Sequence, residues 1–301
     1  MEQPPNRPFT LAVFTKNRVN PAYDAARLAA DRVAAEAGAR TLHYVPATPD
    51  HVGEQKALVA EALAARPDAV LFNPTDDVAM AADVERIVAA GIPVAVFINR
   101  MNVPVLTFVG SDDIRVGETI ALRLFEGLGG TGRVVALDGT PGARTARDRT
   151  EGLKRALSQC PRIELIGSRI GYLQEAPART AMVELLQAHP QIDGVWTAND
   201  VMAFGALTAL REAGRTATVV GINGLPAAIE HIERGTLLAS VDFSAFNIAA
   251  IAARAVLRHL AGQPVPPEIM VPAELIDRSN CDRWKVPFER RPIPIWADFV
   301  R

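Results

Sequence analysis

Short apolar runs alternate with amphipathic stretches along most of this chain. The amphipathic stretches place apolar residues at spacings of three and four, which is typical of helices with one buried face. Runs such as FTLAVF (9–14) and AVLFNP (69–74) are apolar almost throughout, as expected of strands covered by helices on both sheet faces. Strands and helices that alternate in this way predict right-handed βαβ units and a parallel sheet.

The alternation starts twice. The first unit is expected to have strands at 9–14, 41–45, 69–74 and 93–98, and helices at 20–38, 52–65 and 77–91. After VLTFVGSDD (105–113), helices are expected at 114–127, 145–158, 175–188, 200–213 and 225–234, and strands at 133–138, 163–168, 194–198, 218–222 and 237–243. Helix 244–262 and the proline-rich segment 263–301 are too short for a third domain. The two alternating units predict the α/β fold class, with two Rossmann-like lobes that each contain a parallel sheet. The last segment is expected to return across both lobes.

Composition narrows the classes of partner. The chain has 301 residues, 49% of them hydrophobic, and a net charge of -2. It has no basic stripe and no block of like charge, so nucleic acids and anionic membranes are poor candidate partners. No apolar run approaches the roughly 18 residues of a membrane span. The polar start MEQPPNRPFT fits a cytoplasmic chain, and equally an exported chain whose signal peptide has been removed.

Two further sequence features, the cysteines and a glycine-rich segment, give only weak indications of a function. Cys160 and Cys281 lack metal-ligand spacing, and the sequence leaves open whether they pair. GLGGTG (127–132) fits the dinucleotide pattern G-x-G-x-x-G, but it ends a helix and precedes a strand. A phosphate site requires the opposite order, so we interpret this segment as a helix stop and a turn.

Polar residues gather where the expected strands end, which is where open α/β sheets bind ligands. They are Thr15, Lys16, Asn17, Asn20 and Tyr23 after the first strand, Asn73, Asn99 and Arg100 later in the first unit, and Arg144, Arg147, Arg149, Asn199, Asp200, Asn223, Asp242 and Phe243 in the second. Any single Asn or Asp can be an ordinary helix cap or turn residue. Asparagine at several strand ends, with arginine at two, favours a small ligand that carries many hydroxyls.

At these positions the chain resembles the type I periplasmic sugar-binding proteins of ABC importers, the ribose-binding class, from about residue 9 to 276. The motifs that carry the resemblance include NPAYDAA (20–26), FNPTDDVAM (72–80), INR (98–100), ARDRTEGL (146–153) and VVGINGLPAAIEHIERGTLLASV (219–241). The resemblance implies three crossings between the lobes, near 110–112, 242–244 and 271–273. The expected N-terminal lobe is 9–110 plus 244–271, the expected C-terminal lobe is 111–243 plus 272–301, and 1–8 is expected to be disordered or a linker.

The resemblance also implies a function. The chain is expected to capture a pentose, another monosaccharide or a polyol between its lobes, and to deliver it to the membrane subunits of an ABC importer. We expect a periplasmic monomer that needs no metal and no cofactor. The expected ligand contacts are Asn20, Tyr23, Asn73, Asn99, Arg100, Arg149, Asn199, Asn223 and Phe243, with Asp242 added for its place at a strand end. Arg149 should reach into the cleft, Arg147 should pack or pair nearby, and Arg144 should be solvated.

The chain departs from the family at four positions. Asn99 and Asn223 stand where the family usually has Asp, and Ala22 and Leu173 stand where aromatic residues are common. The cleft is therefore expected to be more electropositive and less suited to a large flat ring. A pentose, an acyclic polyol and a sugar acid all stay open, with a preference for the neutral ligands.

Other functions fit the sequence less well. None of the five histidines follows an expected strand beside a nucleophile, and no H-E-x-x-H, G-x-S-x-G or phosphate loop occurs, which disfavours an enzyme. A repressor of this fold would need about 60 residues of DNA-binding domain before residue 9. A ligand-sensing module of the same fold is the remaining alternative.

Overall fold

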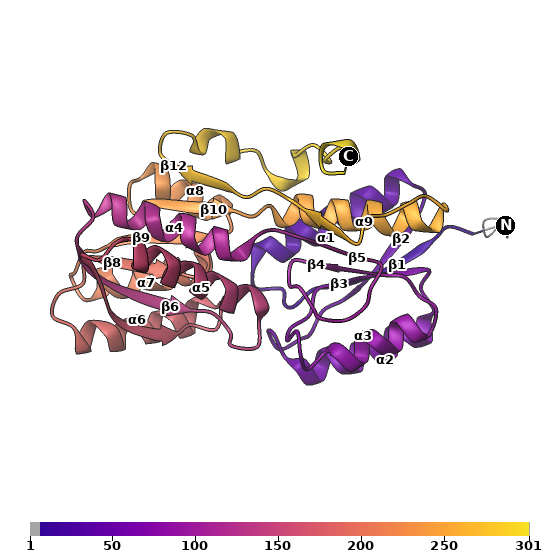
Figure 1. The fold of residues 1–301 in the computed structure, drawn as a ribbon, viewed down its shortest axis with the longest axis horizontal. Helices are drawn as coiled ribbons and strands as arrows, with labels where there is room; N and C mark the ends of the chain where they lie inside the picture. Colours follow the sequence, from indigo (N-terminus) through magenta and orange to yellow (C-terminus); the bar gives the residue numbers. More distant parts are fainter. Residues whose placement is uncertain (1–6, 301) are drawn as a thin grey trace.

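Two six-stranded sheets lie side by side along the long axis of the molecule, each covered by helices (Figure 1). The structure is a computed structural model, and it describes residues 7–300. The N-terminal sheet has the order β11-β5-β4-β3-β1-β2, and all its pairs are parallel. Its strands are β1 (Thr10–Phe14), β2 (Arg40–Tyr44), β3 (Ala69–Phe72), β4 (Val94–Phe97), β5 (Thr107–Gly110) and β11 (Glu268–Met270).

Side chains alternate between the two faces of this sheet. Leu11 and Val13 pack with α1 (Pro21–Glu36) and α9 (Ala245–Leu260), whereas Ala12 and Phe14 pack with α2 (Val52–Ala65) and α3 (Ala81–Ala89). Both sets are fully buried, which explains why the strands are apolar throughout in the sequence. The sheet is thus the middle of three layers.

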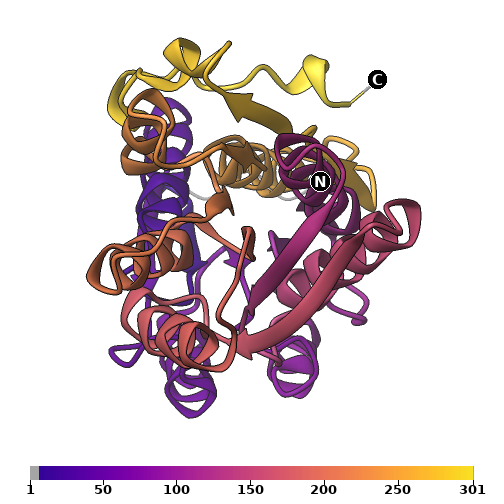
Figure 2. The ribbon, with the colours of Figure 1, turned by 90° about the vertical axis from the view of Figure 1, so that its left-hand side faces the viewer.

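The C-terminal sheet has the order β12-β10-β9-β8-β6-β7. Its strands are β6 (Gly132–Asp138), β7 (Ile163–Ile170), β8 (Gly194–Thr197), β9 (Thr218–Ile222), β10 (Ala239–Asp242) and β12 (Glu274–Asp277), of which only β12 is antiparallel to its neighbour. Helices α4 (Asp113–Gly127) and α5 (Arg144–Gln159) pack together on one face, and α6 (Glu175–Ala188), α7 (Asp200–Glu212) and α8 (Pro226–Glu233) lie on the other (Figure 2).

The chain passes between the lobes three times. The crossings are at 111–112, between β5 and α4, at 243–244, between β10 and α9, and at 271–273, between β11 and β12. Three crossings allow the lobes to rotate about a common hinge while each sheet keeps its own core.

The C-terminal tail runs across both lobes, as expected from the sequence, so 272–301 does not belong to the C-terminal lobe alone. Helix η1 (Cys281–Trp284) packs on α8, but η2 (Phe288–Arg290) packs on α1 of the N-terminal lobe, and Arg258 of α9 lies over the ring of Trp296 in η3 (Trp296–Asp298). The tail therefore runs over both lobes, as the yellow segment of Figure 1 shows. The short apolar pieces separated by prolines fit a segment that follows an existing surface.

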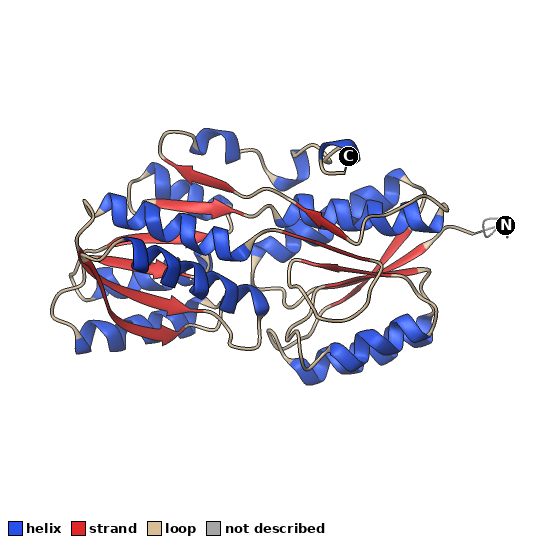
Figure 3. Cartoon of the chain, in the orientation of Figure 1, coloured by secondary structure: helices blue, strands red, loops and turns tan. Residues whose placement is uncertain are grey.

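The regular elements agree closely with the sequence expectations (Figure 3). The glycine-rich segment ends α4 at Gly127 and begins β6 at Gly132, as its interpretation as a stop and turn requires. The expectation for 1–8 lies outside the described residues, except that Arg7 pairs with Asp68 at 2.9 Å. Both cysteines are free thiols, and no helix of the described chain is long and apolar enough to cross a membrane.

Candidate functional site

A small closed cavity lies between the lobes, at the carboxyl ends of their strands. Its volume is about 20 Å³, which is room for roughly one water molecule. The N-terminal lobe contributes Asn20, Ala22, Tyr23 and Ile98, and the C-terminal lobe and its hinge contribute Thr145, Arg149, Leu173, Asn199, Asn223 and Phe243. Six of the expected ligand contacts therefore line one cavity, and the lobes must separate before a sugar can enter it.

Arg149 is the charged side chain of the lining. Its Nε donates to Asp113 Oδ1 at 2.8 Å, its Nη1 donates to the Ala198 carbonyl at 2.9 Å, and the guanidinium lies 4.9 Å from the ring centre of Phe243. The side chain is only 5% exposed. Two of its nitrogens are thus held by the protein, and Nη2 has no hydrogen bond within residues 7–300.

Two of the asparagines are helix caps as well as lining residues. Asn20 Oδ1 accepts from the Ala22 backbone NH at 3.0 Å, and Asn199 Oδ1 accepts from the Met202 NH at 2.9 Å. Asn199 Nδ2 donates to the Leu173 carbonyl at 3.1 Å. The ordinary capping interpretation and the cavity interpretation are therefore both correct for these residues, because α1 and α7 begin at the cavity wall.

Asn73 and Asn99 do not line the cavity but connect its two sides. Asn99 Nδ2 donates to Asn73 Oδ1 at 2.8 Å, and Thr145 Oγ1 donates to Asn99 Oδ1 at 3.0 Å across the lobes. Asn73 Nδ2 is buried and has no partner in the described chain. This chain of hydrogen bonds orients Thr145, a lining residue that the sequence interpretation did not include.

Asn223 has a free acceptor and an unusual backbone. Its Nδ2 donates to Asn20 Oδ1 at 3.4 Å across the lobes, while its Oδ1 is buried without a partner in the described chain. Its φ is 137°, and Ile98 on the opposite wall has φ 62°. Such values are uncommon for residues other than glycine, and they concentrate at binding sites.

Arg100 was expected in the cleft, and the structure places it elsewhere. Its guanidinium forms an ion pair with Glu268 of β11 and lies 4.1 Å from the ring centre of Phe108. The side chain is 40% exposed. Adjacent residues after β4 point in different directions, so Asn99 turns inward and Arg100 turns to the edge formed by β5 and β11.

Asp242 was also expected in the cleft, and it faces the C-terminal tail instead. Its Oδ2 accepts from Trp284 Nε1 at 2.9 Å, and its Oδ1 accepts from the Ser244 NH at 2.6 Å. Arg291 Nη1 lies 3.7 Å from Oδ2. The carboxylate therefore ties the tail to the second crossing, and it does not restore a negative charge to the cavity.

Arg144, Arg147 and Arg149 form a cluster in the first turns of α5, and the first two have different contacts from Arg149. Arg144 pairs with Asp148 one turn along α5, at 2.9 Å, and its side chain is 41% exposed. Arg147 pairs across the lobes with Asp77 at 2.7 Å. The cluster thus divides into a solvent-facing residue, an interlobe contact and a cavity residue.

Burial raises the pKa of three groups near the cavity. It raises the pKa of Asp113 to about 6, although the Arg149 cation opposes the shift. Burial also raises the pKa of Asp200 to about 7, although hydrogen bonds from Leu225 and Ser240 oppose it. Burial raises the pKa of Tyr23 as well, which keeps its phenol neutral at physiological pH.

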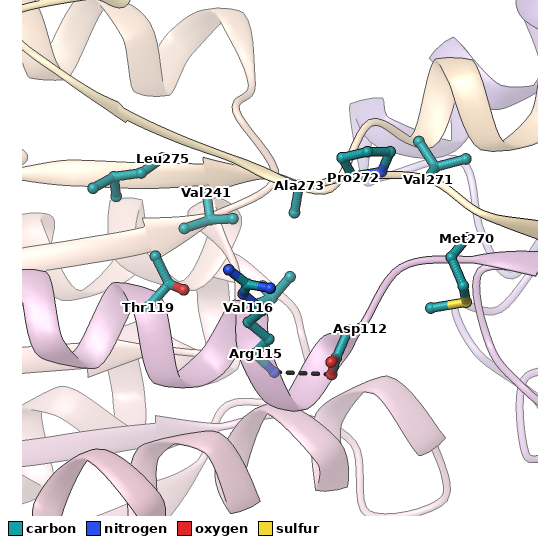
Figure 4. A pocket seen from close by; sticks show the side chains of 10 residues that line it. All are labelled: Asp112, Arg115, Val116, Thr119, Val241, Met270, Val271, Pro272, Ala273 and Leu275. Atoms are coloured by element: carbon teal, nitrogen blue, oxygen red, sulfur yellow. Dashed lines mark hydrogen bonds between the residues drawn. The ribbon is translucent and has the colours of Figure 1, made fainter. Parts of the chain in front are cut away.

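A larger hollow lies at the hinge, outside the cavity. It has a volume of about 450 Å³ and is lined by Asp112, Arg115, Val116, Thr119, Val241, Met270, Val271, Pro272, Ala273 and Leu275 (Figure 4). Its walls come from the first and third crossings and from the adjacent α4, β10, β11 and β12. It contains none of the expected ligand contacts, and its position makes it part of the hinge.

Comparison with known proteins gives consistent matches. The model of the periplasmic binding protein domain family matches residues 11–264. The ribose import binding protein RbsB of Bacillus subtilis is 31% identical over 269 residues, which are 89% of this chain and 87% of that protein.

Solved structures match over a similar range. A solute-binding protein of an ABC transporter from Actinobacillus succinogenes, with bound D-allose, has a TM-score of 0.86 and 26% identity, and the match covers 91% of this chain and 99% of that one. A solute-binding protein from Mycobacterium smegmatis, with bound glycerol, has a TM-score of 0.86 and 27% identity, with 92% and 96% covered.

Proposed function

This chain belongs to the periplasmic binding protein family, and from that premise we propose that it captures a small hydroxylated ligand between its lobes. The ligand is a pentose, another monosaccharide or a polyol, which the chain delivers to the membrane subunits of an ABC importer. Relatives are named for ribose, D-apiose and xylitol, all of which are small and rich in hydroxyls. The proposed location is the periplasm, and the proposed role is binding without catalysis.

The observation that carries this function is the cavity lined from both lobes. Asn20 and Tyr23 come from one lobe, and Arg149, Asn199 and Asn223 come from the other. A ligand that touches both sets binds the closed form better than the open form, which is the condition for ligand-driven closure. We assign ligand contact to the expected residues that line the cavity, and a positioning role to Asn73 and Asn99.

The charge distribution favours a neutral ligand over a sugar acid. The cation of Arg149 already has a carboxylate partner, because Asp113 lies 2.8 Å from its Nε. A paired cation attracts a second carboxylate less strongly than a free one does. Hydroxyls both donate and accept, which suits Asn223 Oδ1, an acceptor without a partner in the described chain, and Arg149 Nη2, a donor that the hydrogen bonds of Nε and Nη1 leave unused.

Titration calorimetry tests this function. We expect D-ribose, D-allose, D-apiose or xylitol to bind with a stoichiometry of one per chain, and D-ribonate to bind more weakly or not at all. The affinity should be unchanged in a metal chelator, because no metal site is part of the proposal. Binding of D-ribonate in preference to every neutral sugar and polyol would contradict the neutral-ligand assignment, and no binding by any of them would contradict the function.

A further inference from the structure

The C-terminal tail adds a further connection between the lobes, behind the three hinge crossings. Asp242 and Phe243 are adjacent at the second crossing, where Phe243 lines the cavity and Asp242 accepts a hydrogen bond from Trp284 of the tail. The tail therefore lies on the side of this crossing that faces away from the cavity. Figure 1 shows it as the yellow segment that runs from β12 over the hinge towards α9.

On the C-terminal lobe, the tail is held at its first 3₁₀ turn. η1 packs on α8, and Lys285, which directly follows η1, pairs with Glu233 of α8 at 2.5 Å. Trp284 Nε1 donates to Asp242 Oδ2 at 2.9 Å, and Arg291 Nη1 lies 3.7 Å from the same oxygen. The tail is therefore tied both to α8 and to the end of β10.

On the N-terminal lobe, the next two 3₁₀ turns are held by α1 and α9. Arg32 Nη1 of α1 donates to the Arg291 carbonyl at 2.7 Å and to the Phe288 carbonyl at 3.4 Å. Arg258 of α9 lies 4.8 Å from the ring centre of Trp296. These contacts are with the other lobe, so the tail is anchored on each side of the hinge.

The piece of tail between the two anchors is short and stiff. Two residues, Val286 and Pro287, separate Lys285 from η2, and three residue steps span at most about 11 Å. Proline fixes its own φ, and Pro287 is extended, with φ -56° and ψ 148°. Arg291 Nε donates to the Val286 carbonyl at 3.2 Å, which holds the piece against η2. The tail therefore has little length to give when one lobe moves against the other.

We propose that residues 281–298 act as a strap that favours the closed orientation of the lobes and so raises the affinity for the ligand. The lobes are closed in this structure, since the cavity has a volume of only about 20 Å³, and the strap contacts both lobes in this orientation. Opening rotates α8 and β10 relative to α1 and α9, so the strap must give up contacts on one lobe. Contacts made only in the closed form shift the equilibrium towards it. The strap goes beyond the proposed ligand chemistry, because it acts with any ligand that closes the lobes.

The rival explanation is a tail that only covers apolar surface. The ring of Phe288 stacks on that of Phe246 in α9, with the ring centres 6.5 Å apart, and such packing stabilises the folded chain whatever the lobes do. A tail of this kind would leave the balance between open and closed forms unchanged. The two explanations therefore differ in ligand affinity, and melting temperature alone does not separate them.

Calorimetry with D-ribose, D-allose, xylitol and myo-inositol as probes tests the strap. Arg32→Met removes the donor to the two tail carbonyls, and Arg32 does not line the cavity. This variant is expected to bind the probe that the parent binds at least about threefold more weakly, because its closed form is less favoured. Arg86→Met is the matched control, because Arg86 pairs with Asp83 of its own helix α3 at 2.9 Å and should leave affinity unchanged.

Trp296→Leu is a second release of the strap from the N-terminal lobe, and it replaces Arg32→Met if that variant does not fold. It removes the ring beneath Arg258 and is expected to weaken binding in the same direction. A folded variant that binds like the parent, whatever its melting temperature, overturns the strap and leaves the proposed function intact. Tighter binding also overturns the strap, since the tail would then resist closure.

A parent chain that binds none of the probes contradicts the proposed function, and small-angle scattering of the ligand-free protein then tests the strap. A larger radius of gyration in Arg32→Met than in the parent and in Arg86→Met supports the strap. An equal radius in all three proteins overturns it.

Discussion

Arg147 Nη2 of the C-terminal lobe donates to both carboxylate oxygens of Asp77 in the N-terminal lobe, each at 2.7 Å. Arg147 Nη1 donates to the Pro141 carbonyl at 2.9 Å, which fixes the guanidinium at the edge of the cleft. The Asp77 NH also donates to the Gly142 carbonyl, at 3.4 Å. The contacts with Asp77 join the lobes only when they are close together, so they stabilise the closed form.

Arg147→Met removes this interlobe ion pair and should weaken ligand binding about two- to fivefold. The effect is modest because the Arg147 side chain is 43% exposed, and partly solvated pairs contribute at most about 1 kcal/mol. Arg144→Met is the control, since Arg144 pairs only within α5, with Asp148. If calorimetry gives equal affinities for the two variants, the Arg147–Asp77 pair does not contribute to closure.

Arg149→Lys should lower ligand affinity by at least about tenfold. A lysine ammonium has three donors, but all are on one nitrogen, so it cannot occupy the separate positions from which Nε contacts Asp113, Nη1 contacts the Ala198 carbonyl and Nη2 faces the ligand. Arg144→Lys, on the solvated side of the same turn, should change affinity less than about twofold. The assignment of the cavity would be wrong if Arg149→Lys bound its ligand like the parent while Arg144→Lys did not.

Much of the fold could be predicted from the sequence because its strands are buried on both faces. Leu11 and Val13 pack on one face of the sheet, and Ala12 and Phe14 pack on the other. Because helices cover both faces, all four of these residues are apolar, and the sequence shows them as an unbroken apolar run. The ends of the expected strands then indicated which residues would form the site. Six of them line one cavity in the structure: Asn20, Tyr23, Arg149, Asn199, Asn223 and Phe243. The return of the tail across both lobes was expected, but its short 3₁₀ turns could not be predicted, because they have no periodicity of their own.

The site predictions that differ from the structure depend on side-chain direction. Arg100 is drawn outward by Glu268 and by the nearby ring of Phe108, and Asp242 is drawn to Trp284. Glu268 lies 168 residues from Arg100 in the chain, and Trp284 lies 42 residues from Asp242. Thr145 joins the site through Asn99 of the other lobe. A sequence pattern places a residue at a strand end, but these long-range partners decide which way it points.

The tail should contribute to stability through its contact with the hinge. Trp284 Nε1 donates to the buried Asp242 Oδ2 at 2.9 Å, and hydrogen bonds to charged groups contribute about 1.5–3 kcal/mol. A double-mutant cycle with Trp284→Phe and Asp242→Ala, measured by chemical denaturation, should give a coupling free energy of about 1 kcal/mol or more. If the effects of the two substitutions on the free energy of unfolding are additive, the hydrogen bond between Trp284 and Asp242 does not contribute to stability.

Asp200 should make the protein less stable as the pH rises from about 4 to about 7. Burial raises the pKa of this carboxyl from 3.8 to about 7, so the folded state holds a proton that the unfolded state has already released in this range. The free energy of unfolding therefore falls as the pH rises. Asp200→Asn cannot titrate and should show a shallower fall in denaturation experiments at pH 5 and pH 8, with Asp113 still contributing. An unchanged slope would contradict the assignment to Asp200.

The central claim is that a ligand closes the lobes around the cavity between them. Because the closed cavity holds only about 20 Å³, a sugar or polyol must enter an open form and then favour closure. Small-angle scattering of the unsubstituted protein, with and without a saturating ligand identified by calorimetry, measures this directly. The account predicts a smaller radius of gyration in the bound protein, and an unchanged radius at saturation would contradict it.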